Sequence, residues 1–329
     1  MRNAVITSTG SYAPDRIIPN SYFDTLLGED VSTWLVENLS IRQRHWCNEN
    51  ESTVDLCYHA AQKALKNAGL NPDQLDLIIV ATDTPEYISP STASVLQHRL
   101  GAKKVGTFDV NTACAGFVTG FDMAAKYIRA DESYRHILLV GAYAMSKYLN
   151  MTDKKTVTLF ADGAGAVILS AEETKSRGFL GGSLHTEGQY HDWMGIYAGG
   201  THLPVSEQLV ANKDHLLKFV KKFPKELNPE VWSRMITDLS GRFGIKPQDI
   251  QHYFFTQINI NSIYQTLENL GVPKERAHNI MDRYAYTGSA CIPMALDDAM
   301  QKGVVNRGDL MVFMGSGGGL AFACAAVRF

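Results

Sequence analysis

The sequence has few cysteines, and none lie in the short-spaced pairs that hold zinc sites or disulfide frameworks. Five cysteines occur in 329 residues, an odd number without any CxxC pair. The ten histidines include no HExxH motif, and neither a P-loop nor a GxGxxG loop after a strand is present. We therefore expect no disulfide framework, no metal and no nucleotide cofactor, which leaves a chemical role open for at least one cysteine.

An excess of charge and a long apolar run are also missing. Lys and Arg number 31 against 34 Asp and Glu, which gives a net charge of −3. Nucleic acids and anionic membranes bind proteins that have an excess of Lys and Arg, so neither is expected as a partner. The strongly apolar stretches, such as 75–82 and 137–145, are far shorter than the roughly 20 residues of a membrane span. With no signal peptide evident at its start, we expect a cytoplasmic chain without a membrane span.

The chain contains an internal repeat. The segment GLNPDQLDLIIVAT at 69–82 is similar to GIKPQDIQHYFFTQ at 244–257, and TACAG at 112–116 corresponds to TGSAC at 287–291. Residue 69 thus corresponds to 244 and residue 112 to 287, so both pairs have the same offset of 175 residues. The shared offset indicates a duplicated unit, and two such units should pack about a pseudo-twofold axis.

Each copy has the same order of elements. An amphipathic helix leads through a Gly-Pro turn to an apolar strand, and small residues then lead into a second helix and a further strand. This pattern predicts an α/β protein with buried strands, divided into halves at 1–172 and 173–329. Residues 190–225 have no counterpart in the first half, and we interpret them as an insertion that covers or shapes a pocket.

Cys114 has the setting of a nucleophile. It lies where an apolar strand gives way to small residues and then to an expected helix over 118–128. Unpaired N–H groups and the dipole at a helix N-terminus stabilise a thiolate and donate to a developing oxyanion. The other four cysteines lack this setting, so we interpret them as inert core residues.

Ordered motifs extend from one end of the chain to the other. They are TGSYAP at 9–14, IRQRH at 41–45, DVNTACAGF at 109–117, FADGAGA at 160–166, GGG at 317–319 and VRF at 327–329. Together they resemble the thiolase-fold condensing enzymes, most closely the β-ketoacyl-acyl-carrier-protein synthase III family. The resemblance implies an α/β protein with the thiolase-like five-layered αβαβα fold, built from two duplicated halves. It also implies a homodimer in which Cys114 takes an acyl group from coenzyme A or an acyl carrier protein.

Two positions depart from the pattern of that family. Its members pair the cysteine with a histidine in a Pro-His-Gln-Ala-Asn motif and with an asparagine further along the chain. An ungapped alignment places FTQIN at 255–259 on the motif, so Thr256 takes the histidine position whereas Gln257 and Asn259 match. Tyr286 takes the asparagine position.

These departures change the expected chemistry. The Thr256 hydroxyl and the Tyr286 phenol can each donate one hydrogen bond, but neither becomes a cation or a base near pH 7. Decarboxylation of a malonyl thioester should therefore be weak. Acyl loading depends mainly on Cys114 and on backbone donors at Cys114 and Gly318, so we expect it to remain. The alternative is a noncatalytic subunit that pairs with a complete synthase.

The missing histidine leaves the base unassigned, and Glu86 is one candidate. Its loop, DTPEYISP at 83–90, reaches toward the partner's active site in related condensing enzymes. The competing interpretation of Glu86 is a solvated loop carboxylate.

Further residues are candidates for substrate contacts. Trp34, with Arg42 downstream, is similar to the family's coenzyme A mouth, where an indole stacks on adenine and a cation meets phosphate. Asn259 is assigned to the substrate site by its motif. A basic run with helical spacing, Lys218, Lys221, Lys222 and Lys225, is either a docking face for an acidic carrier protein or a solvated helical face.

Overall fold

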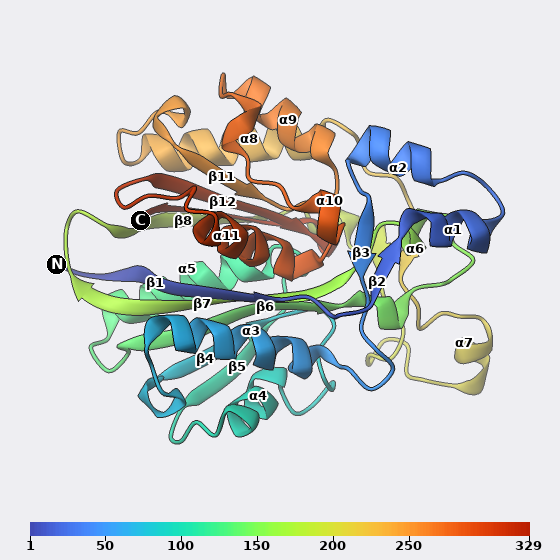
Figure 1. Ribbon diagram of the computed structural model, residues 1–329, viewed down its shortest axis with the longest axis horizontal. Helices are drawn as coiled ribbons and strands as arrows, with labels where there is room; N and C mark the ends of the chain where they lie inside the picture. Colours follow the sequence, from blue (N-terminus) through green and yellow to red (C-terminus); the bar gives the residue numbers. More distant parts are fainter.

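Two β-sheets dominate the computed structural model, which describes all 329 residues (Figure 1). The five-stranded sheet has the order β1 (Arg2–Tyr12), β7 (Asp162–Glu173), β6 (His136–Ala144), β4 (Leu77–Ala81) and β5 (Gly106–Val110). The four-stranded sheet has the order β11 (His252–Phe255), β12 (Leu310–Gly317), β13 (Ala321–Arg328) and β8 (Gly178–Thr186).

Helices form three layers around these sheets. The middle layer consists of α5 (Gly116–Ala130), which contacts both sheets, and α11 (Cys291–Gln301). The outer face of the five-stranded sheet is covered by α3 (Thr53–Ala68) and α4 (Thr92–Leu100), and α8 (Leu227–Gly241) and α9 (Ile260–Asn269) cover the other sheet, as Figure 1 shows. The expected five-layered αβαβα architecture is therefore confirmed.

The two halves repeat one topology. β4 and β6 are parallel neighbours, and β6, β7 and β1 then continue as antiparallel neighbours. The second sheet repeats this arrangement, because β11 and β12 are parallel whereas β12, β13 and β8 are antiparallel. The strand β4 begins at residue 77 and β11 at 252, which is again an offset of 175. β5 alone has no counterpart in the second sheet. It is an edge strand of the five-stranded sheet.

Most residues of the middle helices are buried because both faces of these helices are covered. Ten of the fifteen residues of α5 are buried, including Phe117, Val118 and Phe121. All five residues of β4 are buried as well, as expected for a parallel strand covered on both faces. The expected helix at 118–128 thus lies within α5, and the expected strand at 252–255 is β11.

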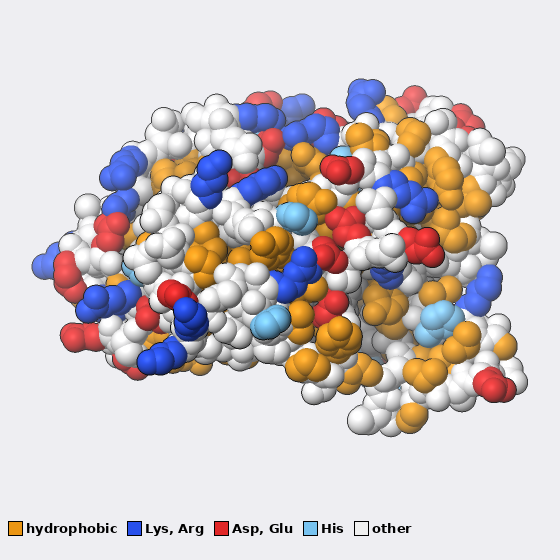
Figure 2. Space-filling model, turned by 60° about the horizontal axis from the view of Figure 1, so that its bottom comes forward, with side chains coloured by type: hydrophobic (Ala, Val, Ile, Leu, Met, Phe, Trp, Pro, Cys, Tyr) orange, Lys and Arg blue, Asp and Glu red, His pale blue; other side chains and the backbone are white.

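Smaller elements gather at the end of the molecule opposite the two termini (Figure 1). They are β2 (Ile17–Pro19), α1 (Asn20–Leu27), α2 (Ser32–Leu39), β3 (Gln43–His45), α6 (Lys154–Val157), β9 (Met194–Gly195), α7 (Glu207–Ala211), β10 (Lys218–Phe219) and α10 (Met281–Tyr284). Hydrophobic side chains are concentrated toward this end on the face drawn in Figure 2. None of the helices is long and apolar enough to cross a bilayer.

The expected helical spacing of the basic run is wrong. Lys218 lies in β10, which pairs with β9, and residues 220–225 form no helix. Two of these lysines are already paired with carboxylates, since Lys218 contacts Asp214 and Lys221 lies 3.5 Å from Asp192. The four lysines therefore do not share one helical face.

Glycines allow α11 to pack directly on the five-stranded sheet. A Cβ atom at Gly165 of β7 would lie 2.6 Å from the backbone nitrogen of Met294, and one at Gly141 of β6 would lie 2.3 Å from the carbonyl oxygen of Ser289. Both contacts are with backbone, which cannot rotate away. Side chains at these two positions would force the layers apart.

The Gly165→Ala variant should therefore lower the free energy of unfolding by about 1–3 kcal/mol, the usual cost of overpacking. Urea titration with circular dichroism measures this change. The matched control is Gly188→Ala, because a Cβ atom there meets nothing within 4 Å. An equal change in both variants would contradict the close packing of α11 on β7.

Candidate active site

Cys114 lies in a sharp turn between β5 and α5. The preceding residue, Ala113, has a positive φ of 46°, and α5 begins two residues later at Gly116. The end of β12 presses on this turn, because a Cβ atom at Gly317 would lie 2.6 Å from the Cys114 nitrogen. Strand, turn and helix together therefore fix the thiol, which is only 2% exposed.

The thiol faces a cavity of about 180 Å³. The cavity is lined by Asp83, Asn111, Ala113, Cys114, Tyr143, Met145, Met194, Gly195, Ile196, Leu217 and Gly318. Four of these residues belong to the segment 190–225, which therefore forms part of the cavity wall. Asp83 is the one charged side chain among the lining residues.

A larger groove lies elsewhere on the surface. It has a volume of about 610 Å³ and follows α3 beside Tyr12, His59 and Lys63. No cysteine lines it, and it is open to solvent on one side. The smaller cavity combines a buried nucleophile with a carboxyl group, so we take it as the candidate active site.

Tyr286 contacts the nucleophile directly. A hydrogen bond from its phenol lowers the pKa of Cys114. The ring is 1% exposed and packs against Phe160 and Tyr143, with centroids 5.4 and 6.3 Å away. As at Cys114, the preceding residue has a positive φ, which is 50° at Ala285.

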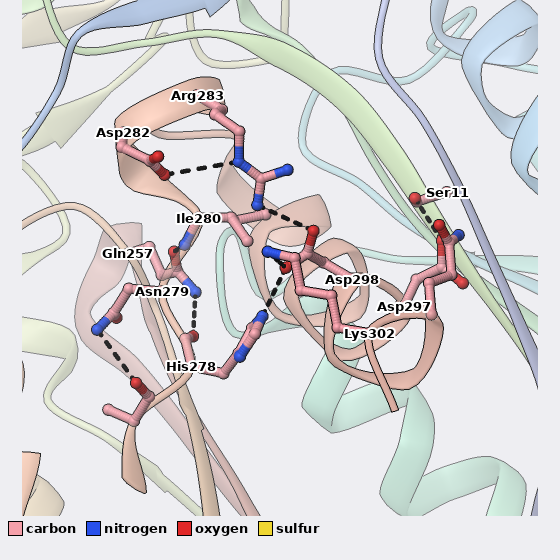
Figure 3. Close-up of polar contacts among 12 residues, drawn as sticks. Ser11, Gln257, His278, Asn279, Ile280, Asp282, Arg283, Asp297, Asp298 and Lys302 are labelled. Carbon is pink, nitrogen blue, oxygen red and sulfur yellow. Dashed lines mark hydrogen bonds and ion pairs between the residues drawn. The ribbon is translucent and has the colours of Figure 1, made fainter. Parts of the chain in front are cut away.

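A polar network positions the segment that leads to Tyr286 (Figure 3). The Gln257 amide donates to the carbonyl of His278 at 3.0 Å and accepts from the nitrogen of Ile280 at 2.9 Å. Asp298 of α11 contacts His278 at 2.6 Å and Arg283 at 2.9 Å. The end of β11 and the middle helix layer thus hold this segment from two sides.

The structure does not bring Thr256 to the cavity. Its hydroxyl accepts a hydrogen bond from the backbone nitrogen of Ser316 at 2.9 Å and lies 3.4 Å from the carbonyl of the same residue. The side chain is 1% exposed and fastens the end of β11 to β12. Its hydroxyl is therefore committed to the backbone and does not point a free donor at Cys114.

Burial dominates the electrostatics of the thiol. Desolvation raises the pKa of Cys114 well above its ordinary value, and the charge of Asp83 raises it further. The hydrogen bond from Tyr286 opposes these effects without cancelling them. A thiolate stabilised by the helix terminus was expected, whereas burial in the turn favours the protonated thiol.

Asp83 was not singled out by the sequence, although the cavity contains it. It lies two residues beyond the end of β4, and Cys114 lies four residues beyond the end of β5. These strands are parallel neighbours, so their carboxyl ends meet at one edge of the sheet. A carboxyl residue directly after a buried strand was the signal that could have identified it.

Glu86 is hydrogen-bonded within its own chain. Its carboxylate accepts hydrogen bonds from the Ser52 hydroxyl and the Val54 nitrogen, both at 3.0 Å. These contacts place it at the N-terminus of α3, where a negative charge is favourable. Glu86 does not line the cavity.

The expected substrate contacts lie outside the cavity. Trp34 on α2 is 53% exposed, and Arg42 is also exposed. Asn259 caps α9 by accepting from the nitrogen of Asn261 at 3.0 Å. α2 and α9 are in contact, so these residues lie in one region of the surface. The structure therefore brings together Cys114, Tyr286 and Gly318, but not Thr256, Glu86 or the surface group.

Family models match both halves of the chain. The model for 3-oxoacyl-[acyl-carrier-protein (ACP)] synthase III matches residues 108–188, and the model for the C-terminal part of the same enzyme matches 241–329. A β-ketoacyl-[acyl-carrier-protein] synthase III of Desulfitobacterium hafniense strain Y51 is 35% identical over 324 residues, covering 98% of this chain and 97% of that protein. The β-ketoacyl-[acyl-carrier-protein] synthase III of Staphylococcus epidermidis strain RP62A is 34% identical over 330 residues, with 99% of each chain covered.

Solved structures give the same result. The 3-oxoacyl-[acyl-carrier-protein] synthase III of Aquifex aeolicus VF5 superposes with a TM-score of 0.89 at 29% identity, covering 99% of this chain and 100% of that one. The corresponding enzyme of Pseudomonas aeruginosa PAO1 gives 0.90 at 29% identity, covering 99% and 98%. These likenesses confirm the thiolase-type fold. The chain therefore belongs to the 3-oxoacyl-[acyl-carrier-protein] synthase III family of acyl-transferring condensing enzymes.

Proposed function

We propose that Cys114 carries the acyl group in this enzyme. The thiol sulfur attacks the carbonyl of an acyl-coenzyme A or an acyl carrier protein, the free carrier thiol leaves, and an acyl-Cys114 thioester remains. The acyl group then passes to an acceptor in fatty acid, lipid or polyketide metabolism. The observation that carries this proposal is the buried Cys114 thiol, held in its turn, facing a mostly apolar cavity and bonded to Tyr286.

Backbone groups would stabilise the charge that develops during transfer. Cys114 lies just before the first turn of α5, and Gly318 lines the same cavity from the turn that follows β12. Nitrogen donors at these two positions would form an oxyanion site without a side chain. Gly318 also lies close to the insertion, since a Cβ atom there would be 3.4 Å from the carbonyl oxygen of Met194.

Thr256 and Tyr286, at the positions of the family's histidine and asparagine, favour acyl loading of Cys114 over decarboxylation of a malonyl thioester. An enolate needs donors that are free to meet its oxygen. The Thr256 hydroxyl is bonded to Ser316, and the Tyr286 phenol is bonded to Cys114. We therefore propose that Tyr286 acts on the Cys114 thiol and that Thr256 holds the end of β11 against β12.

Exposed residues of the chain offer contacts for the partners of such a reaction. Exposed Trp34 and Arg42, with Asn259 nearby, would meet the nucleotide and pantetheine parts of coenzyme A. Unpaired lysines between 218 and 225 would meet an acidic carrier protein. A second copy of the chain would cover Tyr87 and Ile88, which are 54% and 86% exposed on the loop that also holds Glu86. We also propose that the enzyme is a homodimer and is located in the cytoplasm.

Incubation with a panel of acyl-coenzyme A donors should add one acyl mass per chain, because Cys114 is the one cysteine lining the cavity. Intact-mass spectrometry measures this addition, and the Cys114→Ala variant should gain no acyl mass. Modification of another cysteine would contradict the assignment. No modification with any donor would favour a noncatalytic subunit that pairs with a complete synthase.

Decarboxylation of malonyl-coenzyme A should be much slower than acyl loading, because the Thr256 hydroxyl is bonded to backbone and neither Thr256 nor Tyr286 becomes a cation or a base near pH 7. Release of labelled carbon dioxide, measured with enzyme already acylated at Cys114, gives the rate. Decarboxylation as fast as loading would contradict this prediction, because Thr256, Tyr286 or another group would then have to stabilise the enolate.

The Tyr286→Phe variant should raise the pKa of Cys114, because it removes the hydrogen bond that lowers it. The pH profile of alkylation by iodoacetamide should move to higher pH, and alkylation at neutral pH should be slower because less thiolate is present. Tyr253→Phe is a suitable control, since that buried hydroxyl donates to the carbonyl of Pro247 and does not line the cavity. An unchanged profile in Tyr286→Phe would show that the phenol does not act on the thiol.

A further inference from the structure

Acyl loading at Cys114 requires a proton acceptor. Burial raises the pKa of the Cys114 thiol and so favours its protonated form, whose proton must leave as the sulfur attacks. Burial raises the pKa values of Tyr286 and Tyr143 well above the ordinary value for tyrosine, and neither phenol can accept a proton. No histidine, lysine or arginine lines the cavity. The histidine of related enzymes is replaced by Thr256, whose hydroxyl is bonded to backbone.

Asp83 lines the same cavity, and one of its two carboxylate oxygens has no partner. Its Oδ1 atom is buried and has no hydrogen-bond partner. No cation is paired with it, whereas most of the other buried or half-buried carboxylates in the chain are paired with cations or accept hydrogen bonds. A buried carboxylate oxygen without a partner is costly, which favours a chemical role for this group in the cavity.

The surroundings of Asp83 suit proton transfer. The titratable groups that interact with its charge are Cys114 before α5, Tyr143 of β6 and Tyr148 in the turn after β6. Burial raises the pKa of Asp83 to about 6. The carboxylate is thus mostly ionised near pH 7 and is more basic than an ordinary aspartate, which is the range that suits a general base.

We propose that Asp83 is the general base of this site and accepts the proton of the Cys114 thiol as the sulfur attacks the acyl thioester. The proposal rests on the proposed acyl loading. The new bond joins the Cys114 sulfur to the acyl carbon, and the bond between that carbon and the carrier sulfur breaks. The proton passes from Cys114 to Asp83 and then to the leaving carrier thiolate, directly or through one water molecule, so that the carboxylate is regenerated.

A purely electrostatic role for Asp83 predicts the opposite result. The negative charge raises the pKa of Cys114, so removing it should increase the thiolate fraction. If Asp83 did nothing else, its loss would accelerate every reaction of the thiol. If Asp83 is the base, its loss slows acylation even though the thiol becomes more acidic.

The test compares two reactions of Cys114 in the wild type and in Asp83→Asn, which keeps the shape of the side chain. Alkylation by iodoacetamide reports the thiolate, and rapid-quench mass spectrometry with the acyl-coenzyme A that loads the wild type best reports acylation. We expect Asp83→Asn to be alkylated at least as fast as the wild type and acylated about 100-fold more slowly at pH 7. Intact alkylation of Cys114 in the variant also shows that its site is folded.

The pH profile separates the base from a structural role. Acylation of the wild type should rise with pH and level off above about pH 6, the pKa of Asp83. In Asp83→Asn it should keep rising through neutral pH, because solvent must take the proton. Millimolar formate, a carboxylate small enough for the vacated position, should restore part of the rate.

Four outcomes would overturn the proposal. Equal acylation rates in the two proteins, or faster acylation of Asp83→Asn, would assign to Asp83 an electrostatic role only. Loss of the pH 6 inflection in Glu86→Gln instead would make Glu86 the base. Absence of acylation in the wild type with every donor would remove the proposed function, and this proposal with it.

Discussion

The close contact of both sheets with the turn at Cys114 determines the geometry of the site. A Cβ atom at Gly315 of β12 would lie 2.9 Å from the Cα atom of Ala115, and one at Gly116 would lie 3.2 Å from the side chain of Ala81 in β4. Gly317 of β12 also packs against the Cys114 nitrogen. The turn is thus held between β12 of one sheet and β4 of the other. The cavity therefore combines groups from both halves of the repeat, which neither half could assemble alone.

The sequence predicted the features that depend on local pattern and repetition. The offset of 175 residues gave the paired topology, and the small residues around Cys114 gave the turn before α5. The motifs shared with the synthase III family predicted the five-layered fold and the family itself. The contacts of Thr256 could not be predicted in this way, because its position in an alignment says nothing about Ser316, sixty residues away on the neighbouring strand. The helical spacing of the lysines failed because strand pairing between β9 and β10 outweighs local periodicity.

The choice between Glu86 and Asp83 shows where sequence reasoning ends. The two carboxylates are three residues apart in one loop, and composition cannot separate them. Glu86 lies at the start of α3, where two hydrogen bonds and the helix dipole satisfy its charge. Asp83 lies just after β4 and Cys114 just after β5. Because these two strands are parallel neighbours, both residues lie at the same edge of the sheet. What differs is the three-dimensional environment, which gives the Glu86 carboxylate two hydrogen bonds and leaves Oδ1 of Asp83 with none.

The cost of holding Asp83 in this environment is itself an argument for its role. A pKa raised from 3.8 to about 6 means that the folded chain binds this proton more tightly than the unfolded chain does. The contribution of Asp83 to stability is therefore highest below pH 4 and is lost as the pH rises through 6, a difference on the order of 3 kcal/mol at neutral pH. No contact within the chain offsets this loss at Oδ1. A group that destabilises the fold under neutral conditions is better explained by chemistry at Cys114 than by packing, because an uncharged residue of similar size would fill the position without the cost.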